Sequence, residues 1–249
     1  MANTFEALRK AEKEDQIRPE KAKEFELNPR PKPHIPVESK LPHQIAEEYR
    51  RLKHYLLSSV VDRKIKTLLF SSSTEGEGNS TVLSNYAITL ASDGDKVILI
   101  DANLRNPAFH DLFSLDKKGG LTELLLEEKS LNDVIKQTRL KNLSVITSGI
   151  PHTNPSSIYK SQLLDSIIEQ LKAHYDWILF DSPPINTCND STSLAGKVDG
   201  VMMVVQAEKI RWEVAQSAKE RIENGKSKIL AVVLNRKIMH IPNWVYKML

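Results

Sequence analysis

The sequence predicts an α/β fold in which a mostly parallel sheet is covered by helices on both faces. Short apolar runs alternate with helical stretches between residues 66 and 234. The runs are continuously apolar instead of alternating with polar residues, which is typical of parallel strands buried on both faces. Three of them lead into polar segments, at residues 71–81, 101–105 and 181–184. Because ligands bind at the carboxyl ends of the strands in such sheets, these segments are the candidates for a functional site.

The first 41 residues differ in composition from the rest of the chain. Residues 1–14 are compatible with a short helix that carries a thin apolar stripe and is either weakly docked or used to bind a partner. Six of the 12 prolines lie in residues 15–42 among mostly charged residues, which predicts an extended linker. We therefore expect residues 1–41 to be an N-terminal segment and proline-rich linker. Residues 42–249 should form one domain with a short C-terminal tail.

The domain begins with a predicted helix at residues 42–60. Its apolar residues recur at helical spacing and should face the core: Ile45, Tyr49, Leu52, Leu56 and Val60. Strands are expected at residues 66–71, 96–100, 143–147, 177–180, 200–205 and 229–234. Further helices are expected at residues 80–92, 121–126, 131–135, 161–174 and 212–224. Trp212 and Trp244 are expected to pack against the domain, with a contact between Trp212 and a nucleotide base as the alternative.

The composition argues against several classes of protein. Lys plus Arg number 35 and Asp plus Glu number 32, so the net charge of +3 does not predict binding to nucleic acid. The single cysteine, Cys188, rules out an internal disulfide and is expected to be inert. The histidines show no metal-ligand spacing with cysteines or acids. No apolar run approaches the roughly 20 residues of a membrane helix, and the N-terminus has no signal-peptide core, so we expect a soluble cytoplasmic protein.

A glycine turn follows the first predicted strand and precedes a predicted helix. This layout is that of a phosphate-binding loop, in which backbone N–H groups and a helix N-terminus face an anion. The usual signature ends in Gly-Lys-Ser/Thr, but here Asn79 stands at the lysine position. Ser80 stands where a hydroxyl binds Mg²⁺, although it and Thr81 fit equally well as ordinary first-turn helix residues. The candidate nucleotide-binding residues are Glu75, Gly76, Glu77, Gly78, Asn79, Ser80 and Thr81.

Two other strands lead into acidic residues. Asp181 ends an apolar run and precedes Ser-Pro-Pro. An acid at the end of a buried strand beside a phosphate loop is the usual arrangement for helping to hold Mg²⁺ in P-loop proteins; the alternative is an ordinary capping or turn residue. Asp101 follows the run at residues 96–100 and can bind Mg²⁺ or accept a proton. Asn103 lies two residues on, so the two side chains point the same way if the strand persists. The candidate metal ligands are Ser80, Asp101 and Asp181, and the candidate catalytic residues are Asp101, Asn103 and Asp181.

In this order and spacing, STEGEGNST, VILIDANLRNP and ILFDSPP resemble the three nucleotide motifs of the bacterial tyrosine kinases of polysaccharide export, the BY-kinases. The resemblance extends from about residue 47 to residue 234. Glu47, Arg50 and Lys53 are similar to the family's ExxRxxR oligomerisation stripe, with Lys in place of the last Arg. The LRNP sequence at residues 104–107 resembles the family's LRxP, and residues 149–156 resemble the segment before the helix that precedes the third motif.

The resemblance implies a P-loop fold, binding of ATP or ADP with Mg²⁺, and phosphorylation of protein tyrosines. It also implies a homo-oligomer and a membrane-embedded partner, the co-polymerase that sets polysaccharide chain length. The location implied is the cytoplasm, at the periphery of the inner membrane through that partner. The family's tail carries a tyrosine cluster that neighbouring subunits phosphorylate, and Tyr246 is the candidate acceptor in this tail.

Three departures from the family pattern point to weakened chemistry. Asn79 replaces the lysine, Asn103 replaces the second acid of the middle motif, and the tail offers Tyr246 alone. Loss of one cationic group from a phosphoryl-transfer site, judged from arginine fingers, costs about 10³–10⁵ in rate. A lysine elsewhere in the chain can in principle compensate, and Lys96 and Lys197 are candidates.

The sequence leaves three hypotheses open. The first is a catalytically impaired BY-kinase-like regulator of polysaccharide assembly that binds a membrane-embedded partner, with or without nucleotide. The second is an active tyrosine autokinase that works despite the substitutions. The third is an ATPase-like scaffold of the positioning or partitioning type.

Overall fold

The computed structural model describes residues 41–59, 65–152, 154–159 and 161–237. The predicted N-terminal helix, nearly all of the proline-rich linker, Val60, Trp244 and the candidate acceptor Tyr246 lie outside these residues. Within the described ranges, no helix has the length and apolar character that crossing a membrane requires.

Within the described residues, seven strands form one sheet in the order β3-β4-β2-β5-β1-β6-β7. All neighbouring strands are parallel except the short β3, which runs antiparallel to β4. The predicted mostly parallel sheet is therefore confirmed. The strands are β1 (Thr67–Ser72), β2 (Val97–Asp101), β3 (Lys136–Gln137), β4 (Leu143–Ile146), β5 (Trp177–Asp181), β6 (Gly200–Gln206) and β7 (Ile229–Asn235).

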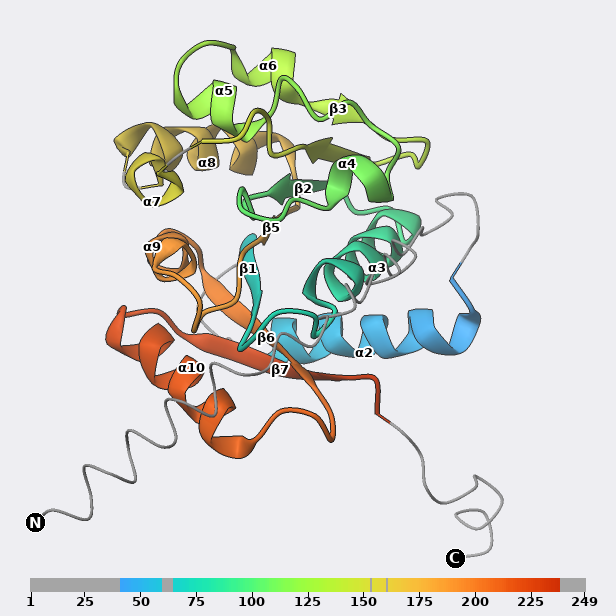
Figure 1. The fold of residues 1–249 in the computed structure, drawn as a ribbon. Helices are drawn as coiled ribbons and strands as arrows, with labels where there is room; N and C mark the ends of the chain where they lie inside the picture. The colour runs from blue at the N-terminus through green and yellow to red at the C-terminus, as the bar shows by residue number, and fades with distance from the viewer. Residues whose placement is uncertain (1–40, 60–64, 153, 160, 238–249) are drawn as a thin grey trace, which may run out of the picture. The chain divides into compact units, whose positions relative to one another are not determined.

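Helices cover both faces of the sheet, and each face has its own apolar core (Figure 1). On one face lie α2 (His43–Ser59), α3 (Asn79–Ser92) and α4 (Phe109–Leu112). On the other lie α5 (Leu121–Leu125), α6 (Leu131–Val134), α7 (Pro155–Ile158), α8 (Gln162–His174), α9 (Asp190–Ala195) and α10 (Trp212–Asn224). The central strands are buried along their whole length, which explains why their sequences are continuously apolar.

Two predicted core positions are wrong. Ile45 is 44% exposed, because the first turns of α2 present Ala46 to the core instead. Further along α2 the prediction is confirmed, since Leu56 is fully buried. Trp212 is 74% exposed at the first residue of α10, a helix that buries Ala218 and Ile222 further along.

Candidate nucleotide-binding site

The three polar segments come together because β2, β5 and β1 are neighbours at the centre of the sheet. Asp101 at the end of β2 is paired in register with Asp181 at the end of β5. Asp181 is in turn paired with Phe70 of β1, just before the glycine turn. Parallel strands end at the same edge, so the acids and the turn share one site, as the sequence predicts.

The glycine turn has the backbone that a phosphate-binding loop needs. Gly76 and Gly78 have φ angles of 80° and 89°, in the left-handed region that other residues rarely adopt. Apart from Gly76 and its two chain neighbours, no atom of the described residues lies within 4 Å of the position that a Cβ of Gly76 would occupy. Gly78 is the N-cap of α3, and no side chain caps that helix within the described structure. The first-turn N–H groups of α3 therefore have no side-chain acceptor at the N-cap, where an anion would bind.

Glu77, a candidate nucleotide-binding residue, turns its carboxylate into the protein. Its Oε1 accepts hydrogen bonds from the Thr74 N–H at 2.5 Å and the Ser73 hydroxyl at 2.7 Å. Its Oε2 accepts one from the Gln206 N–H at the end of β6, at 3.0 Å. The side chain is buried and fastens the loop to β6, which leaves the backbone of Glu77 as the part that can meet a ligand.

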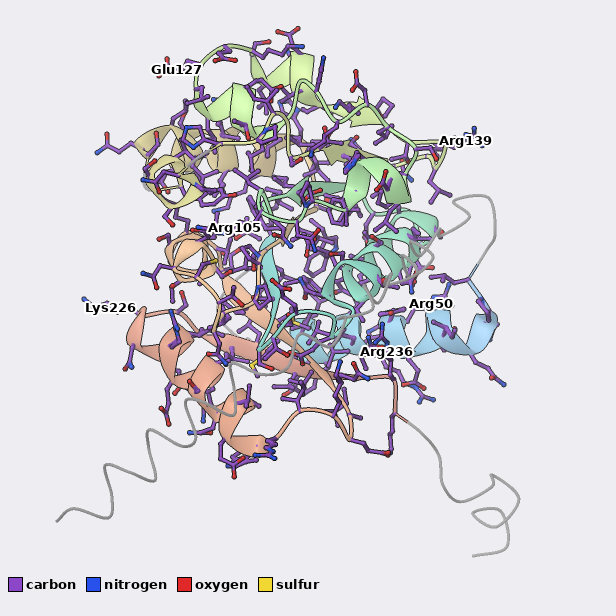
Figure 2. The ribbon with its side chains drawn as sticks, viewed as in Figure 1. Arg50, Arg105, Glu127, Arg139, Lys226 and Arg236 are labelled. Carbon is purple, nitrogen blue, oxygen red and sulfur yellow. The ribbon has the colours of Figure 1, made fainter. Side chains whose placement is uncertain are left out.

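Two residues at the end of β7 hold the loop from the other side, and the sequence analysis missed both. The Asn235 amide donates to the Glu77 carbonyl at 2.8 Å. The Arg236 guanidinium, labelled in Figure 2, donates to the Gly76 carbonyl and the Gln206 side chain, each at 3.2 Å. The available signal was a polar pair at the end of an apolar run, which is similar to the signal that identified the two acids.

Asn79 does not point its amide at a phosphate site. Its Nδ2 donates to the Phe70 carbonyl at 3.0 Å and to Asp181 Oδ1 at 2.6 Å. A side-chain amide has two donor hydrogens, and both are therefore used within the protein. The Ser80 hydroxyl donates to Asp181 Oδ2 at 2.6 Å, so the first two residues of α3 both bind the acid of β5.

The acid pair is fully buried and lacks a directly bonded cation among the described residues. Asp101 Oδ2 accepts from the N–H groups of Ala108 and Phe109 at 3.0 Å each, yet burial raises the pKa of Asp101 to about 6. Burial and then the charge of Asp101 raise the pKa of Asp181 to about 8. Two carboxyls in one dry site disfavour each other's ionisation, and a divalent cation is the natural countercharge.

The donor set fits Mg²⁺ brought with a nucleotide. Within the described chain, no group of three or more His, Cys, Asp and Glu side chains is placed to hold a metal ion. Mg²⁺, however, usually takes one or two carboxylates together with water and substrate phosphates. Asp181, Asp101 and the hydroxyl of Ser80 would supply such oxygen ligands.

Asn103 begins the turn that follows β2. The strand β2 ends at Asp101, so the condition for Asp101 and Asn103 to point the same way is not met. Asn103 Oδ1 accepts a hydrogen bond from the Asn106 N–H at 3.1 Å and closes that turn. The turn leads into α4, whose first N–H groups bind Asp101. This helix has four residues, about one turn, and was not predicted.

Arg105 connects the middle motif to the segment that follows β5. Its Nε donates to Asp190 Oδ2 at 2.8 Å, and Ser156 of α7 also donates to Asp190. Figure 2 shows Arg105 beside α9. Burial tends to raise the pKa of Asp190, but the hydrogen bonds from Arg105 and Ser156 outweigh it and hold that pKa below its usual value. The Tyr159 hydroxyl joins the same loops by donating to the Ala102 carbonyl at 2.8 Å.

The predicted oligomerisation stripe lies on α2, and its charges are paired within the chain. Arg50 donates to Asp93 through Nε at 2.9 Å and through a terminal nitrogen at 2.8 Å, and to Glu47 at 2.6 Å. Lys53 donates to Asp95 at 2.5 Å. Both aspartates follow α3, so the stripe fastens α2 to α3.

Neither lysine that was considered as compensation for Asn79 lies in the site. The Lys197 ammonium binds Asp165 of α8 at 2.7 Å. Lys96 precedes β2, at the amino edge of the sheet and therefore opposite the glycine turn. Both suggestions are wrong, because counting along the chain does not show at which edge of the sheet a residue lies.

Comparison with known proteins gives consistent matches. A family model described as an AAA domain matches residues 65–235. The chain is 36% identical to the tyrosine-protein kinase YwqD of Bacillus subtilis (strain 168), over 77% of this chain and 81% of that protein. It is 34% identical to the putative tyrosine-protein kinase CapB of Staphylococcus aureus, over 80% and 88%. The crystal structure of the chimerical protein CapA2B2 superposes with a TM-score of 0.74 at 30% identity, over 78% and 85%.

Proposed function

Because the chain belongs to the family of bacterial tyrosine-protein kinases built on an AAA domain, we propose that it is a nucleotide-binding regulator of extracellular polysaccharide assembly with slow phosphoryl transfer. The observation that carries the proposal is the position of Asn79. Its side-chain Nδ2 donates to the Phe70 carbonyl at 3.0 Å and to Asp181 Oδ1 at 2.6 Å, which uses both amide hydrogens. The residue at the lysine position therefore offers a nucleotide neither a positive charge nor a free hydrogen bond.

Binding of a nucleotide can survive this change. The left-handed glycines and the N-terminus of α3 remain available to phosphate groups. Ser80, Asp101 and Asp181 would hold the Mg²⁺ that accompanies the nucleotide, and that ion would neutralise charge on the phosphates. What the site lacks is the additional cation, whose loss costs about 10³–10⁵ in rate by comparison with arginine fingers.

Asn103 adds to the impairment. At neutral pH an amide cannot accept the proton of an attacking tyrosine hydroxyl, and it brings no negative charge to the metal. Its side-chain oxygen already closes a turn with Asn106. Both substitutions thus weaken transfer more than they weaken binding.

The assembly expected of such a regulator is also a proposal. We assign it a membrane-embedded co-polymerase as partner, a position at the cytoplasmic side of the inner membrane, and self-association through Glu47, Arg50 and Lys53 of α2. Since Arg50 and Lys53 bind Asp93 and Asp95 of the same chain, association through this stripe would exchange these ion pairs between subunits. Residues 1–41 would serve as a segment and linker outside the domain of residues 42–249.

An active autokinase is the alternative, and it is favoured by the relatives that are named tyrosine-protein kinases. An ATPase-like scaffold is a third reading, which predicts a surface-bound dimer that sandwiches nucleotide; a ring-forming assembly would count against it. The first two readings separate in one assay, in which the full chain is incubated with Mg-ATP and probed for phosphotyrosine. The proposal predicts Mg-dependent nucleotide binding with little phosphotyrosine. A clear signal on Tyr246 that disappears in Asp181→Ala would overturn it.

A further inference from the structure

The side-chain carbonyl of Asn79 has no hydrogen-bond partner in the part of the chain that the structure describes. The two hydrogen bonds of Nδ2 fix which end of the amide is oxygen, because only the nitrogen can donate to Phe70 and Asp181. The remaining atom, Oδ1, is buried and accepts no hydrogen bond from any described residue. A buried acceptor of this kind is uncommon in native proteins, and an ion or water is one of its standard explanations.

A second unpartnered oxygen belongs to the same site. Asp101 Oδ2 binds two backbone N–H groups, whereas Oδ1 is buried and has no partner among the described residues. Asp101 lies in register with Asp181, the acid that holds the Asn79 amide. Two acceptors without donors thus flank a buried carboxylate at the position where the phosphate loop normally carries an ammonium group.

The described cations near the site do not satisfy these oxygens. Burial raises the pKa of Asp101 and the charge of Lys117 opposes part of that rise, so Lys117 acts on the site from the loop between α4 and α5. Its backbone carbonyl binds Thr147 at 3.1 Å, but the described structure contains no hydrogen bond from its ammonium to either acid. Arg236 is occupied by Gly76 and Gln206 on the outer side of the loop.

We propose that a monovalent cation of the potassium or ammonium class binds between Asn79 Oδ1 and the Asp101–Asp181 pair and replaces the missing lysine charge when nucleotide binds. The atoms that would ligate the cation are all oxygens: one belongs to a neutral amide and the others to carboxyl groups. Such hard ligands suit a hard cation. Mg²⁺ keeps strict octahedral geometry and several waters, so a buried amide carbonyl is better matched to a weakly hydrated monovalent ion. The proposal rests on the proposed nucleotide binding and adds a cofactor to it.

The test compares the affinity of the full chain for Mg-ADP in potassium, ammonium and choline chloride at equal ionic strength, by calorimetry. Choline is too large to enter, so the wild type should bind about tenfold or more tightly in potassium or ammonium than in choline. Asn79→Lys carries its own charge and should bind tightly in all three salts. Asn79→Ala should bind weakly in all three, whereas Asn85→Ala, on the same helix, should behave as wild type.

The outcomes distinguish the two proposals. Equal Mg-ADP affinity of the wild type in all three salts overturns the cation site and leaves nucleotide binding intact. A loss of affinity in Lys117→Ala with no dependence on the salt also overturns it, because the protein's own lysine then supplies the charge. Failure to bind Mg-ADP in every salt, with Asn79→Lys bound normally, overturns the proposed function itself. Thallium(I), a potassium mimic detected directly by ²⁰⁵Tl NMR, should give a bound signal in wild type that Asn79→Lys abolishes.

Discussion

Replacing Asp101 with asparagine should stabilise the protein when metal and nucleotide are absent. Asp101 is fully buried, and burial raises its pKa from 3.8 to about 6. A change of that size disfavours the ionised carboxylate in the folded state by about 3 kcal/mol. Asparagine is uncharged and keeps an oxygen for the N–H groups of Ala108 and Phe109. Its amide can also donate to Asp181. We expect the free energy of unfolding to rise by about 1–3 kcal/mol at pH 8.

The gain in stability should depend on pH with a definite sign. The folded pKa of Asp101 lies above the unfolded value of 3.8, so wild type loses stability as the pH rises from about 4 to about 6. The variant lacks this loss. Its advantage should therefore be small at pH 4.5 and complete above pH 7.

Urea unfolding in EDTA at pH 4.5 and pH 8 measures both effects, with Asp199→Asn as the matched control. Burial tends to raise the pKa of Asp199, but hydrogen bonds from the N–H groups of Lys66 and Thr67 lower it below its usual value. The control should therefore lose stability at pH 8 and lose less as the pH falls. A destabilised Asp101→Asn at pH 8, or a gain equal at both pH values, would refute the reasoning about the acid pair.

Three further predictions concern the contacts that hold the site. Glu77→Ala should cost about 2–3 kcal/mol and weaken Mg-ADP binding, because it removes the acceptor of the buried Ser73 hydroxyl and of the partly buried N–H groups of Thr74 and Gln206; Glu77→Gln should cost less. Thermal unfolding and calorimetry would show this, and a neutral Glu77→Ala would contradict it. Arg105→Ala should lower the free energy of unfolding by about 1–2 kcal/mol at pH 8 and by less at pH 4, because Arg105 helps to hold the pKa of buried Asp190 low. Urea unfolding curves that are equally shifted at both pH values would argue against this pairing. Arg50→Ala should change the stability of the subunit little, because the ion pair with Asp93 is partly exposed. It should dissociate any oligomer seen by light scattering; an intact oligomer would exclude the α2 stripe as its contact.

Much of the fold could be predicted because the central strands are buried on both faces and read as continuous apolar runs. The long helices were equally visible, since α8 and α10 repeat their apolar residues at helical spacing. The short elements α4, α7, α9 and β3 were not predicted, although the equally short α5 and α6 were, because two to six residues show at most one or two repeats of an apolar pattern. The order of strands was also beyond reach, since local patterns do not record which strands are neighbours.

Part of the candidate site could likewise be predicted from the sequence, and part could not. The residue types that mark it, Gly76, Gly78, Asp101 and Asp181, were visible because each follows or ends a buried strand. Their partners were not visible, because hydrogen bonds such as that from Asn235 to Glu77 join residues distant in the chain. The inward turn of Asn79 depends on the proximity of β5 to β1, which only the folded sheet supplies.

The impairment itself is tested most directly by the rate of phosphoryl transfer from Mg-ATP in potassium buffer. Wild type should be compared with a variant that combines Asn79→Lys with Asn103→Asp, at nucleotide concentrations that saturate each. We predict that wild type binds nucleotide but forms phosphotyrosine at least about 10³-fold more slowly than the double variant. Equal rates in the two proteins, both lost on Asp181→Ala, would contradict it and identify the chain as a working kinase.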